Sequence, residues 1–332
     1  MAIVEISSER AAPVAAPEPE LSILIVTWNS QRWIERCLRS IPAACAGVAY
    51  ETILYDNSSQ DRTLQLVHDD VRLIASQRND GFAGAINRAI GAARGPFVFL
   101  LNPDCELGPR SVTSLVDFLR SHPAVAAVAP LLADERGDSQ RDFQIRRFPT
   151  LPTFVADLLA LNKMWPSNPI TASYRCRDLD LTQPRPVDQP AAAALLLRRE
   201  VFDEIGPLDE QFSPAWFEDV DYCRRLAAAG KEIWIVPAAQ AKHFGGASLE
   251  NVPFARFIEL WYRNMWRYAR KWFTPLKAEM LRWFIMLGMI LRLPAALLGI
   301  AHREVGRAAA FEAYMGVLKR ALERWDDASP SS

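Results

Sequence analysis

The sequence predicts an α/β fold: an open, mostly parallel sheet flanked by helices, with a helical region at its C-terminal end. Short apolar runs of four to seven residues alternate with amphipathic segments between residues 21 and 130. Runs of that length, rich in Val, Ile and Leu, are typical of parallel strands buried on both faces. Their alternation with helical segments at short spacing indicates a sheet covered by helices.

We expect five strands and four helices in this part of the chain. The strands are predicted at 21–27, 51–55, 71–74, 97–101 and 125–130, and the helices at 30–40, 62–70, 84–94 and 111–121, with Pro42 ending the first helix. Residues 131–190 contain many Pro and Arg residues and predict long loops over the sheet. A strand or buried segment at 191–198, a helix at 200–205 and a strand at 233–236 follow, and residues 251–332 are expected to be helical.

The composition is that of a globular protein without a strong overall charge. Half of the 332 residues are hydrophobic, 23% are charged and the formal net charge is -1, so no whole-molecule field attracts nucleic acid. The five cysteines form no CxxC pair, which argues against a disulfide framework or a cysteine zinc site and favours a reducing cytoplasm. Residues 11–20 are a tract of Pro, Ala and Glu, and we expect residues 1–20 to be a disordered leader, not a signal peptide.

Small polar and acidic residues follow the ends of the predicted strands, at 28–30, 56–59, 79–82 and 102–104. In open α/β sheets, ligands bind beyond the carboxyl ends of the strands. Asp56 stands where a nucleotide base or ribose would lie, although capping of the next helix explains part of the segment 56–61. The glycines of the 79–84 loop suit close approach to a phosphate, but they form neither a GxGxxG fingerprint nor a P-loop.

Two residues are candidate metal ligands. Asp104 follows the fourth predicted strand, and a hard cation such as Mg²⁺ or Mn²⁺ commonly takes one or two carboxylates together with diphosphate oxygens. A simple turn aspartate after proline is the alternative for this residue. His243 is one of four histidines, and a lone histidine is more often structural than a ligand; its setting, after a predicted strand and before two glycines, modestly raises the case for a ligand.

A dense acidic cluster opens the helix that begins after Phe217. Glu218, Asp219 and Asp221 follow an apolar segment that includes Trp216. Carboxylates in a first helical turn complement the helix dipole, but capping requires only one or two of them. Carboxylates packed against aromatic surface can have a raised pKa and act as general bases. We therefore expect any catalytic activity to reside here first.

The C-terminal region combines basic and aromatic residues. Residues 254–282 carry an excess of five positive charges with Trp, Tyr and Phe interleaved, which suits a membrane headgroup region or a polyanionic partner. Residues 283–301 form a 19-residue apolar stretch with one charge, Arg292. A central arginine costs a spanning helix roughly 2.5–3.5 kcal/mol, and Pro294 weakens a span further. We favour an interfacial or shallowly inserted segment over a true span; a buried packing helix is the third alternative.

Taken in order, these segments resemble the family 2 inverting glycosyltransferases with a GT-A fold, a Rossmann-type open sheet, and most of all their bacterial rhamnosyltransferase-like branch. The motifs that carry the resemblance are IVTWNS (25–30), YDNSSQD (55–61), NDGFAGAIN (79–87), LLNPD (100–104), LRREVFDEIGPLDEQF (197–212), WFEDVDYCRRL (216–226) and HFGGAS (243–248). They cover about residues 21–250, and their combination is specific although each alone is not. The implied organisation is a GT-A domain at 21–250 and a helical, membrane-associating tail at 251–332.

The resemblance implies a role for individual residues of these motifs. Asp219 would be the general base, with Glu218 and Asp221 orienting the site or contacting the acceptor, and Trp216 on the acceptor side. Asp104 and His243 would bind Mg²⁺ or Mn²⁺, with Asn102 in place of the first aspartate of the family's Asp-x-Asp motif. The donor nucleotide-sugar would be bound by Thr27, Asn29, Asp56, Asn57, Asn79, Gly81, Phe82, Asn87, Asn102 and Asp104.

The reaction implied is transfer of a sugar from a nucleotide-diphosphate donor to a glycan or polyprenyl-diphosphate-linked acceptor, with inversion, in cell-envelope polysaccharide synthesis. The branch suggests dTDP-L-rhamnose as the first donor, and UDP-hexoses such as UDP-galactofuranose or UDP-GlcNAc stay open. The implied location is cytoplasmic and peripheral on the inner face of the cell membrane, with no nucleic-acid partner. A catalytically silent nucleotide-sugar-binding scaffold is the alternative from another class, and the missing GxGxxG disfavours a Rossmann oxidoreductase.

Overall fold

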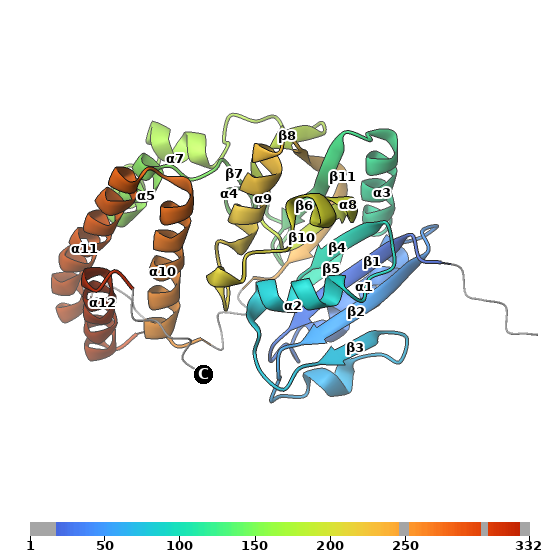
Figure 1. Cartoon of the computed structure of the whole chain (residues 1–332), viewed down its shortest axis with the longest axis horizontal. Helices are drawn as coiled ribbons and strands as arrows, with labels where there is room; N and C mark the ends of the chain where they lie inside the picture. Colours follow the sequence, from blue (N-terminus) through green and yellow to red (C-terminus); the bar gives the residue numbers. More distant parts are fainter. Residues whose placement is uncertain (1–17, 246–251, 300–304, 326–332) are drawn as a thin grey trace, which may run out of the picture.

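A nine-stranded mixed sheet forms the centre of the molecule, and a bundle of helices stands beside it (Figure 1). The computed structural model describes residues 18–245, 252–299 and 305–325. Four parts of the chain lie outside the described residues. They are most of the expected leader, the last part of the HFGGAS motif, the last two residues of the segment 283–301, and the last residues of the chain. The predicted α/β class, with an open sheet and a helical C-terminal region, is confirmed.

The sheet is parallel at one end and mixed at the other. β1 (Leu21–Thr27) pairs in parallel with β2 (Tyr50–Asp56) and β4 (Phe97–Leu101), and β2 pairs in parallel with β3 (Arg72–Ala75). The strand order is β3-β2-β1-β4-β10-β6-β11-β5, and β8 pairs with β11. The other strands are β5 (Cys105–Leu107), β6 (Val125–Ala133), β8 (Arg185–Val187), β10 (Ala194–Arg198) and β11 (Glu232–His243), with β7 (Ile145–Arg146) and β9 (Gln189–Pro190) as a separate pair. The four parallel strands therefore end at one edge, where the polar loops follow.

Helices cover both faces of the sheet. α1 (Ile34–Ala44) and α3 (Ser111–Ser121) pack on the face that receives Ile23 and Ile25 of β1. α2 (Gly81–Ile90), α8 (Glu200–Ile205) and α9 (Glu218–Ala228) pack on the opposite face with Leu24. Alternate residues of a strand point to opposite faces, so a continuous apolar run such as β1 supplies both cores.

Two expected helices differ from the prediction. The segment 62–70 forms only a 3₁₀ turn, η1 (Thr63–Leu66), because its start is bonded to the loop after β1. The Ser30 N–H donates to Thr63 Oγ1 (2.7 Å), and the Gln31 N–H donates to Asp61 (3.1 Å). Pro42 was expected to end α1, which instead continues to Ala44; proline in a last turn removes only one helical hydrogen bond.

The region 131–190, expected as long loops, contains short helices. They are α4 (Arg141–Gln144), α5 (Leu151–Leu158), α6 (Leu161–Met164) and α7 (Pro169–Tyr174). Thr150 caps α5 and Asn168 caps α7, each accepting a hydrogen bond from the backbone N–H three residues on, and each helix has proline in its first turn. Both signals are standard at helix starts, so the sequence carried them and the expectation of loops was wrong.

The helical bundle consists of α10 (Phe254–Trp272), α11 (Pro275–Leu297) and α12 (Arg307–Leu322), with α5 packed against α11 (Figure 1). Its buried side chains form a third hydrophobic core together with Phe154 of α5 and with Phe212 and Phe217, which precede α9. The bundle is therefore packed against the chain segment that leads into the acidic cluster. A domain boundary near residue 250 stays a prediction.

One face of α11 is packed and the other is exposed. Leu281, Ile285 and Met289 are fully buried in the bundle. The outward apolar side chains, which we call the α11 stripe, are 40–72% exposed: Leu276, Met280, Trp283, Leu287, Ile290 and Leu291. By length and composition, α11 is the one helix among the described residues that could cross a membrane.

Candidate active site

The loop after β2 is held to the end of β1 by a buried carboxylate. Asp56 is 1% exposed and accepts hydrogen bonds from Thr27 Oγ1 (2.8 Å), Ser59 Oγ (2.6 Å) and the Ser59 N–H (2.8 Å). Asn29, from the loop after β1, accepts from the Gln60 N–H (2.7 Å). The structure thus brings three of the predicted donor-binding residues, Thr27, Asn29 and Asp56, to one corner of the strand edge.

The loop 79–82 lies between this corner and the segment before α9. The Asn79 side chain accepts from the Gly81 N–H (2.9 Å), and the Asn57 side chain bonds both Asp80 N–H (3.1 Å) and Gly81 O (3.2 Å). Gly81 has φ +74°, and a Cβ there would meet Pro214 Cα at 2.9 Å, so only glycine fits. The Phe82 N–H donates to Pro214 O (2.7 Å). Predicted donor and acceptor segments are therefore in direct contact.

Two other predicted donor residues have structural partners. Asn87 Nδ2 donates to the Leu208 carbonyl, and Asn87 Oδ1 accepts from the Leu208 N–H (2.9 Å each). These two bonds hold α2 against the segment before η2 (Glu210–Phe212). The backbone N–H of Asn102 donates to Ala193 O (2.8 Å), and its half-buried side chain stands at the start of the turn that carries Asp104. Asn102 is thus placed at the edge, while Asn87 stabilises the neighbouring loop.

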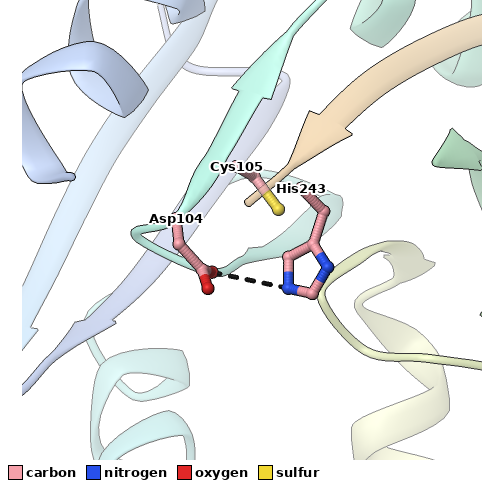
Figure 2. Close-up of side chains that lie close together, drawn as sticks. All are labelled: Asp104, Cys105 and His243. Carbon is pink, nitrogen blue, oxygen red and sulfur yellow. Dashed lines mark ion pairs between the residues drawn. The ribbon is translucent and has the colours of Figure 1, made fainter. Parts of the chain in front are cut away.

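Asp104 and His243 face each other at the ends of two paired strands (Figure 2). β5 and β11 are antiparallel, with His243 opposite Cys105, and the Phe244 N–H donates to Asp104 O (2.9 Å). This pairing sets His243 Nε2 3.6 Å from the carboxylate of Asp104, and both side chains are 5% exposed. The ligand atoms of Asp104, Cys105 and His243 lie within 4.8 Å of one another and could hold a metal ion.

The imidazole of His243 is held in the form that can bind a metal. Gln140 Nε2 donates to His243 O (2.7 Å), which directs the amide oxygen of Gln140 to His243 Nδ1 (2.9 Å). An amide oxygen only accepts, so Nδ1 carries the proton and the Nε2 lone pair faces Asp104. Burial lowers the pKa of His243, and the Asp104 carboxylate opposes this only in part, which favours the neutral ring. The ring stacks on Phe143 (centroids 5.0 Å apart).

These side chains fit a hard divalent cation. Two atoms that each lie about 2.1 Å from one ion can be up to about 4.2 Å apart, and the observed 3.6 Å lies within that limit. Cys105 does not fit as a third ligand, because its thiol donates to Ala193 O (3.3 Å) and burial raises its pKa well above the usual range. A protonated thiol is a poor ligand for Mg²⁺ or Mn²⁺. Asp104 and His243 are therefore the two protein ligands that the geometry offers.

Asp219 is connected to the turn that carries Asp104 through one dipeptide, Ala192–Ala193. Its carboxylate accepts from the Ala192 N–H (3.4 Å) and from the Val220 N–H (2.8 Å). The next residue, Ala193, accepts through its carbonyl from Asn102 N–H and the Cys105 thiol. Ala192–Ala193, just before β10, thus joins the predicted base to the predicted metal-binding turn. Half-buried Asp219 keeps access to solvent or a ligand on the same edge.

The three carboxylates of the acidic cluster differ in their surroundings. Glu218 is 6% exposed, and among the described residues its Oε2 has no hydrogen-bond partner. Burial, reinforced by the charge of Asp219, raises the pKa of Glu218 well above its usual range, which favours the protonated form of this carboxyl. Neighbouring carboxyl groups in contrasting environments can separate acid and base functions. Here Glu218 can donate a hydrogen bond, and Asp219 is the group placed to accept a proton.

Asp221 faces the helical bundle. Its carboxylate is fully buried and bonds Lys271 Nζ (2.9 Å), Trp272 Nε1 (2.8 Å) and Arg225 Nε (3.1 Å). Lys271 also reaches Asp209 (2.7 Å). The bonds to Lys271 and Trp272 hold α9 against α10, and the bond to Arg225 lies within α9. Of the two supporting roles expected for this residue, the contacts favour orienting the site over touching the acceptor.

The segment 211–217, which we call the base loop, is held by side chains of α10. Asn264 is fully buried, and its Nδ2 donates to the carbonyls of Phe212 (2.6 Å), Ala215 (2.8 Å) and Trp216 (3.2 Å). Trp216 and Phe217 have φ of +74° and +76°, values that are costly for bulky residues. Arg263 and Arg267 donate to two further carbonyls of the loop, those of Ser213 and Gln211.

Sequence reasoning missed Gln140 and Asn264. Neither belongs to a motif, and their partners lie 103 and 48–52 residues away along the chain. The tertiary fold brings the Asn264 side chain of α10 to the base loop. It also brings the Gln140 side chain, at the start of α4, to His243.

Comparison with known proteins identifies the family. The model of glycosyl transferase family 2 matches residues 22–206. The chain belongs to glycosyl transferase family 2. An N-acetylglucosaminyl-diphospho-decaprenol L-rhamnosyltransferase of Mycobacterium tuberculosis is 30% identical over 276 residues, which are 77% of this chain and 88% of the relative. Rhamnosyltransferase WbbL of Escherichia coli is 26% identical over 260 residues, 75% of this chain and 92% of the relative.

Solved structures show the fold of this glycosyltransferase to be GT-A. A mannosyltransferase from Pyrobaculum calidifontis, solved with GDP-Man and Mn²⁺, superposes with a TM-score of 0.54 at 16% identity. The superposition covers 96% of this chain and 91% of the mannosyltransferase chain. GalNAc-T7, solved with UDP, GalNAc and Mn²⁺, superposes with a TM-score of 0.55 at 15% identity over 92% of this chain, which spans 56% of that longer protein. The predicted resemblance to rhamnosyltransferase-like members of family 2 is confirmed by the curated relatives.

Proposed function

We propose that this glycosyltransferase moves L-rhamnose from dTDP-L-rhamnose to a polyprenyl-diphosphate-linked N-acetylglucosamine, with inversion at the anomeric carbon. The name of the mycobacterial relative, matched over most of both chains, supports this donor sugar and acceptor. The structural observation that carries the transferase assignment is the placement of Asp219 beside the Asp104 turn, each bonded to one residue of Ala192–Ala193. A catalytically silent scaffold would not need a proton acceptor at this position.

The proposed chemistry is a single displacement. A hydroxyl oxygen of the acceptor attacks the anomeric carbon, the bond from that carbon to the diphosphate oxygen breaks, and Asp219 accepts the hydroxyl proton. Attack opposite to the leaving group inverts the configuration. Burial favours the protonated form of Glu218 by raising its pKa, and in that form Glu218 can donate a hydrogen bond to the acceptor sugar. Asp221 keeps α9 in place through Lys271 and Trp272.

Asp104 and His243 are the proposed metal ligands. A bound Mg²⁺ or Mn²⁺ would neutralise charge that develops on the leaving diphosphate. Gln140 supports this assignment, because it fixes the tautomer in which His243 Nε2 is free to bind. On the donor side, we propose that Asp56, Asn57 and the Gly81 loop surround the nucleotide, at the corner where the three loops meet.

We further propose that the enzyme is peripheral on the inner face of the cell membrane and that the α11 stripe forms the contact. Six large apolar side chains on one helix face are more than a soluble surface usually leaves exposed. The opposite face of α11 is packed in the bundle, so crossing the bilayer would break those contacts, whereas lying in the interface preserves them.

Purified enzyme should transfer radiolabelled rhamnose from dTDP-L-rhamnose to N-acetylglucosaminyl-diphospho-decaprenol, with the product's anomeric configuration opposite to that of the donor. UDP-galactofuranose and UDP-GlcNAc tested in parallel serve as competing donors. Transfer from either of these in preference to dTDP-L-rhamnose would reject the proposed donor. Nucleotide-sugar binding without transfer to any acceptor would support the scaffold alternative.

A further inference from the structure

An apolar cavity opens in the helical part of the molecule, one helix away from the base loop. Its volume is about 380 Å³, within the range of about 300–1,000 Å³ usual for ligand pockets. Every residue that lines it is apolar, including Val155 of α5, Leu159 at the end of that helix, Leu161 of α6, Ile170 of α7 and Phe284 of α11. A sugar or nucleotide would find no hydrogen-bond partner among these side chains. The chemistry of the lining therefore selects a hydrocarbon ligand.

Exposed apolar residues stand next to lining residues of the cavity along two helices, α11 and α6. Phe284 lines the cavity, and its neighbours on α11, Trp283 and Leu287, are 60% and 41% exposed in the α11 stripe. On the side of α6, Met164 and Trp165 are 81% and 53% exposed. A membrane contacted by these exposed side chains would therefore lie near the helices that line the cavity.

α5 connects the cavity to the catalytic side of the molecule. One face of α5 supplies Val155 to the cavity, and Phe154 on another face packs against Phe217 (ring centroids 6.0 Å apart). Phe217 directly precedes Glu218 and Asp219. A helix is about 10 Å thick, so a chain lying in the cavity is separated from the base loop by that distance only. A lipid-linked acceptor needs such an arrangement, because its sugar must reach Asp219 while its hydrocarbon stays out of water.

We propose that this cavity binds the first part of the isoprenoid chain of the lipid-diphosphate acceptor, and so selects lipid-linked over free sugar acceptors. The proposal rests on the proposed function, because it requires a lipid-linked acceptor. It commits to the isoprenoid of the acceptor as the occupant, and an acyl chain of an ordinary phospholipid is the competing source of hydrocarbon. The short distance to the base loop favours the acceptor, since a bulk lipid has no reason to be placed there.

The first test fills the cavity and varies the acceptor chain. Val155→Phe and Leu161→Phe, each adding an apolar group inside the cavity, are compared with Met315→Phe, a half-exposed position on α12 outside the cavity lining. The wild-type enzyme should use N-acetylglucosaminyl-diphospho-decaprenol with kcat/KM roughly tenfold or more above the geranyl analogue, since each buried methylene is favourable. Both cavity variants should lose most of this preference through a higher KM, and Met315→Phe should keep it.

Failure of the cavity assignment and failure of the proposed transferase function give different results. A wild-type enzyme that glycosylates both acceptors equally well, with cavity variants unchanged, would leave the transferase function intact and overturn the cavity assignment. A wild-type enzyme that glycosylates neither acceptor rejects the proposed function and the cavity assignment with it.

A second test needs neither turnover nor a variant that folds. Decaprenyl diphosphate carrying a photoreactive diazirine on its first isoprene units is irradiated with the full chain, and the labelled peptides are identified by mass spectrometry. Label should appear on α5, α6 and the part of α11 around Phe284, and excess unlabelled decaprenyl diphosphate should suppress it. Label elsewhere, or equal labelling of these helices by a diazirine phosphatidylglycerol, would contradict the assignment.

Discussion

Asn264 provides a sharp test of whether the helical bundle shapes the active site. Replacing it with alanine removes the amide that bonds the carbonyls of Phe212, Ala215 and Trp216. Each buried carbonyl left without a partner costs about 1–3 kcal/mol, and the left-handed conformations of Trp216 and Phe217 cost a further 1–3 kcal/mol each, roughly. Taking about 1–2 kcal/mol, the lower part of the first range, for each of two lost bonds gives a shift of the base loop towards other conformations by about 2–4 kcal/mol.

The expected result is a loss of kcat by about 30- to 1,000-fold, since 1.36 kcal/mol corresponds to a factor of ten. KM for the donor should change less than kcat, because the Asp56 carboxylate is held by Thr27 and Ser59 and not by the base loop, whereas the Gly81 loop meets the base loop through the bond from the Phe82 N–H to Pro214 O. Asn264→Asp keeps the shape but replaces donor with acceptor, so it should be worse than Asn264→Ala. Steady-state kinetics and thermal unfolding are measured on both.

Thr113→Val is the matched control for this prediction. The Thr113 hydroxyl is also buried and bonds the carbonyls of Ala44 (3.3 Å) and Ala46 (2.9 Å), but on α3, away from the base loop. It should lower the melting temperature without a comparable loss of kcat. Equal kcat losses in Thr113→Val and Asn264→Ala, or full kcat in Asn264→Ala, would refute the reasoning.

Three further predictions concern protonation, metal binding and the membrane. The raised pKa of Glu218 costs stability as the pH rises above 4.5, the ordinary pKa of the side chain, because the unfolded chain then releases a proton that the folded one retains. Glu218→Gln should therefore gain stability relative to wild type in thermal unfolding as the pH is raised above this value, and a pH-independent difference would argue against the raised pKa. Gln140→Leu should weaken Mn²⁺ binding about 10- to 100-fold by calorimetry, and unchanged affinity would contradict the orienting role towards His243. Trp283→Glu should reduce sedimentation with anionic vesicles several-fold, while Leu73→Glu, on the sheet edge far from α11, should not; equal effects would reject the α11 stripe as the contact.

The sequence predicted the residues at the strand ends of the proposed site better than the hydrogen bonds that hold the surrounding loops in place. Continuous apolar runs predicted the parallel strands, and the strand-end rule then placed Thr27, Asp56 and Asp104 at one edge, where the structure has them. The rule works because parallel strands begin and end together, so local patterns are enough. The strand-end rule does not predict which loops form hydrogen bonds with each other. The 3₁₀ turn at 63–66 arises from bonds to residues 30 and 31, which no local pattern contains.

The acidic cluster shows the same limit within four residues. Sequence spacing treats Glu218, Asp219 and Asp221 as one group in a first helical turn. Their surroundings separate them. Glu218 is buried and its Oε2 has no partner within the described parts of the chain, Asp219 is half-buried at the edge, and Asp221 is bonded to Lys271 and Trp272 of α10. Those contacts span about fifty residues of sequence, so only the tertiary fold could distinguish the three.

The central claim is that Asp219 takes the proton of the acceptor hydroxyl, and Asp219→Asn tests it most directly. This change keeps the size and the hydrogen-bonding oxygen of the side chain but removes its basicity. The account predicts that transfer from dTDP-L-rhamnose falls by about 10²- to 10⁴-fold while calorimetric binding of the donor nucleotide in Mn²⁺ is unchanged. Asp203→Asn, an exposed carboxylate in the first turn of α8, should retain full transfer. Wild-type turnover in Asp219→Asn would contradict the account.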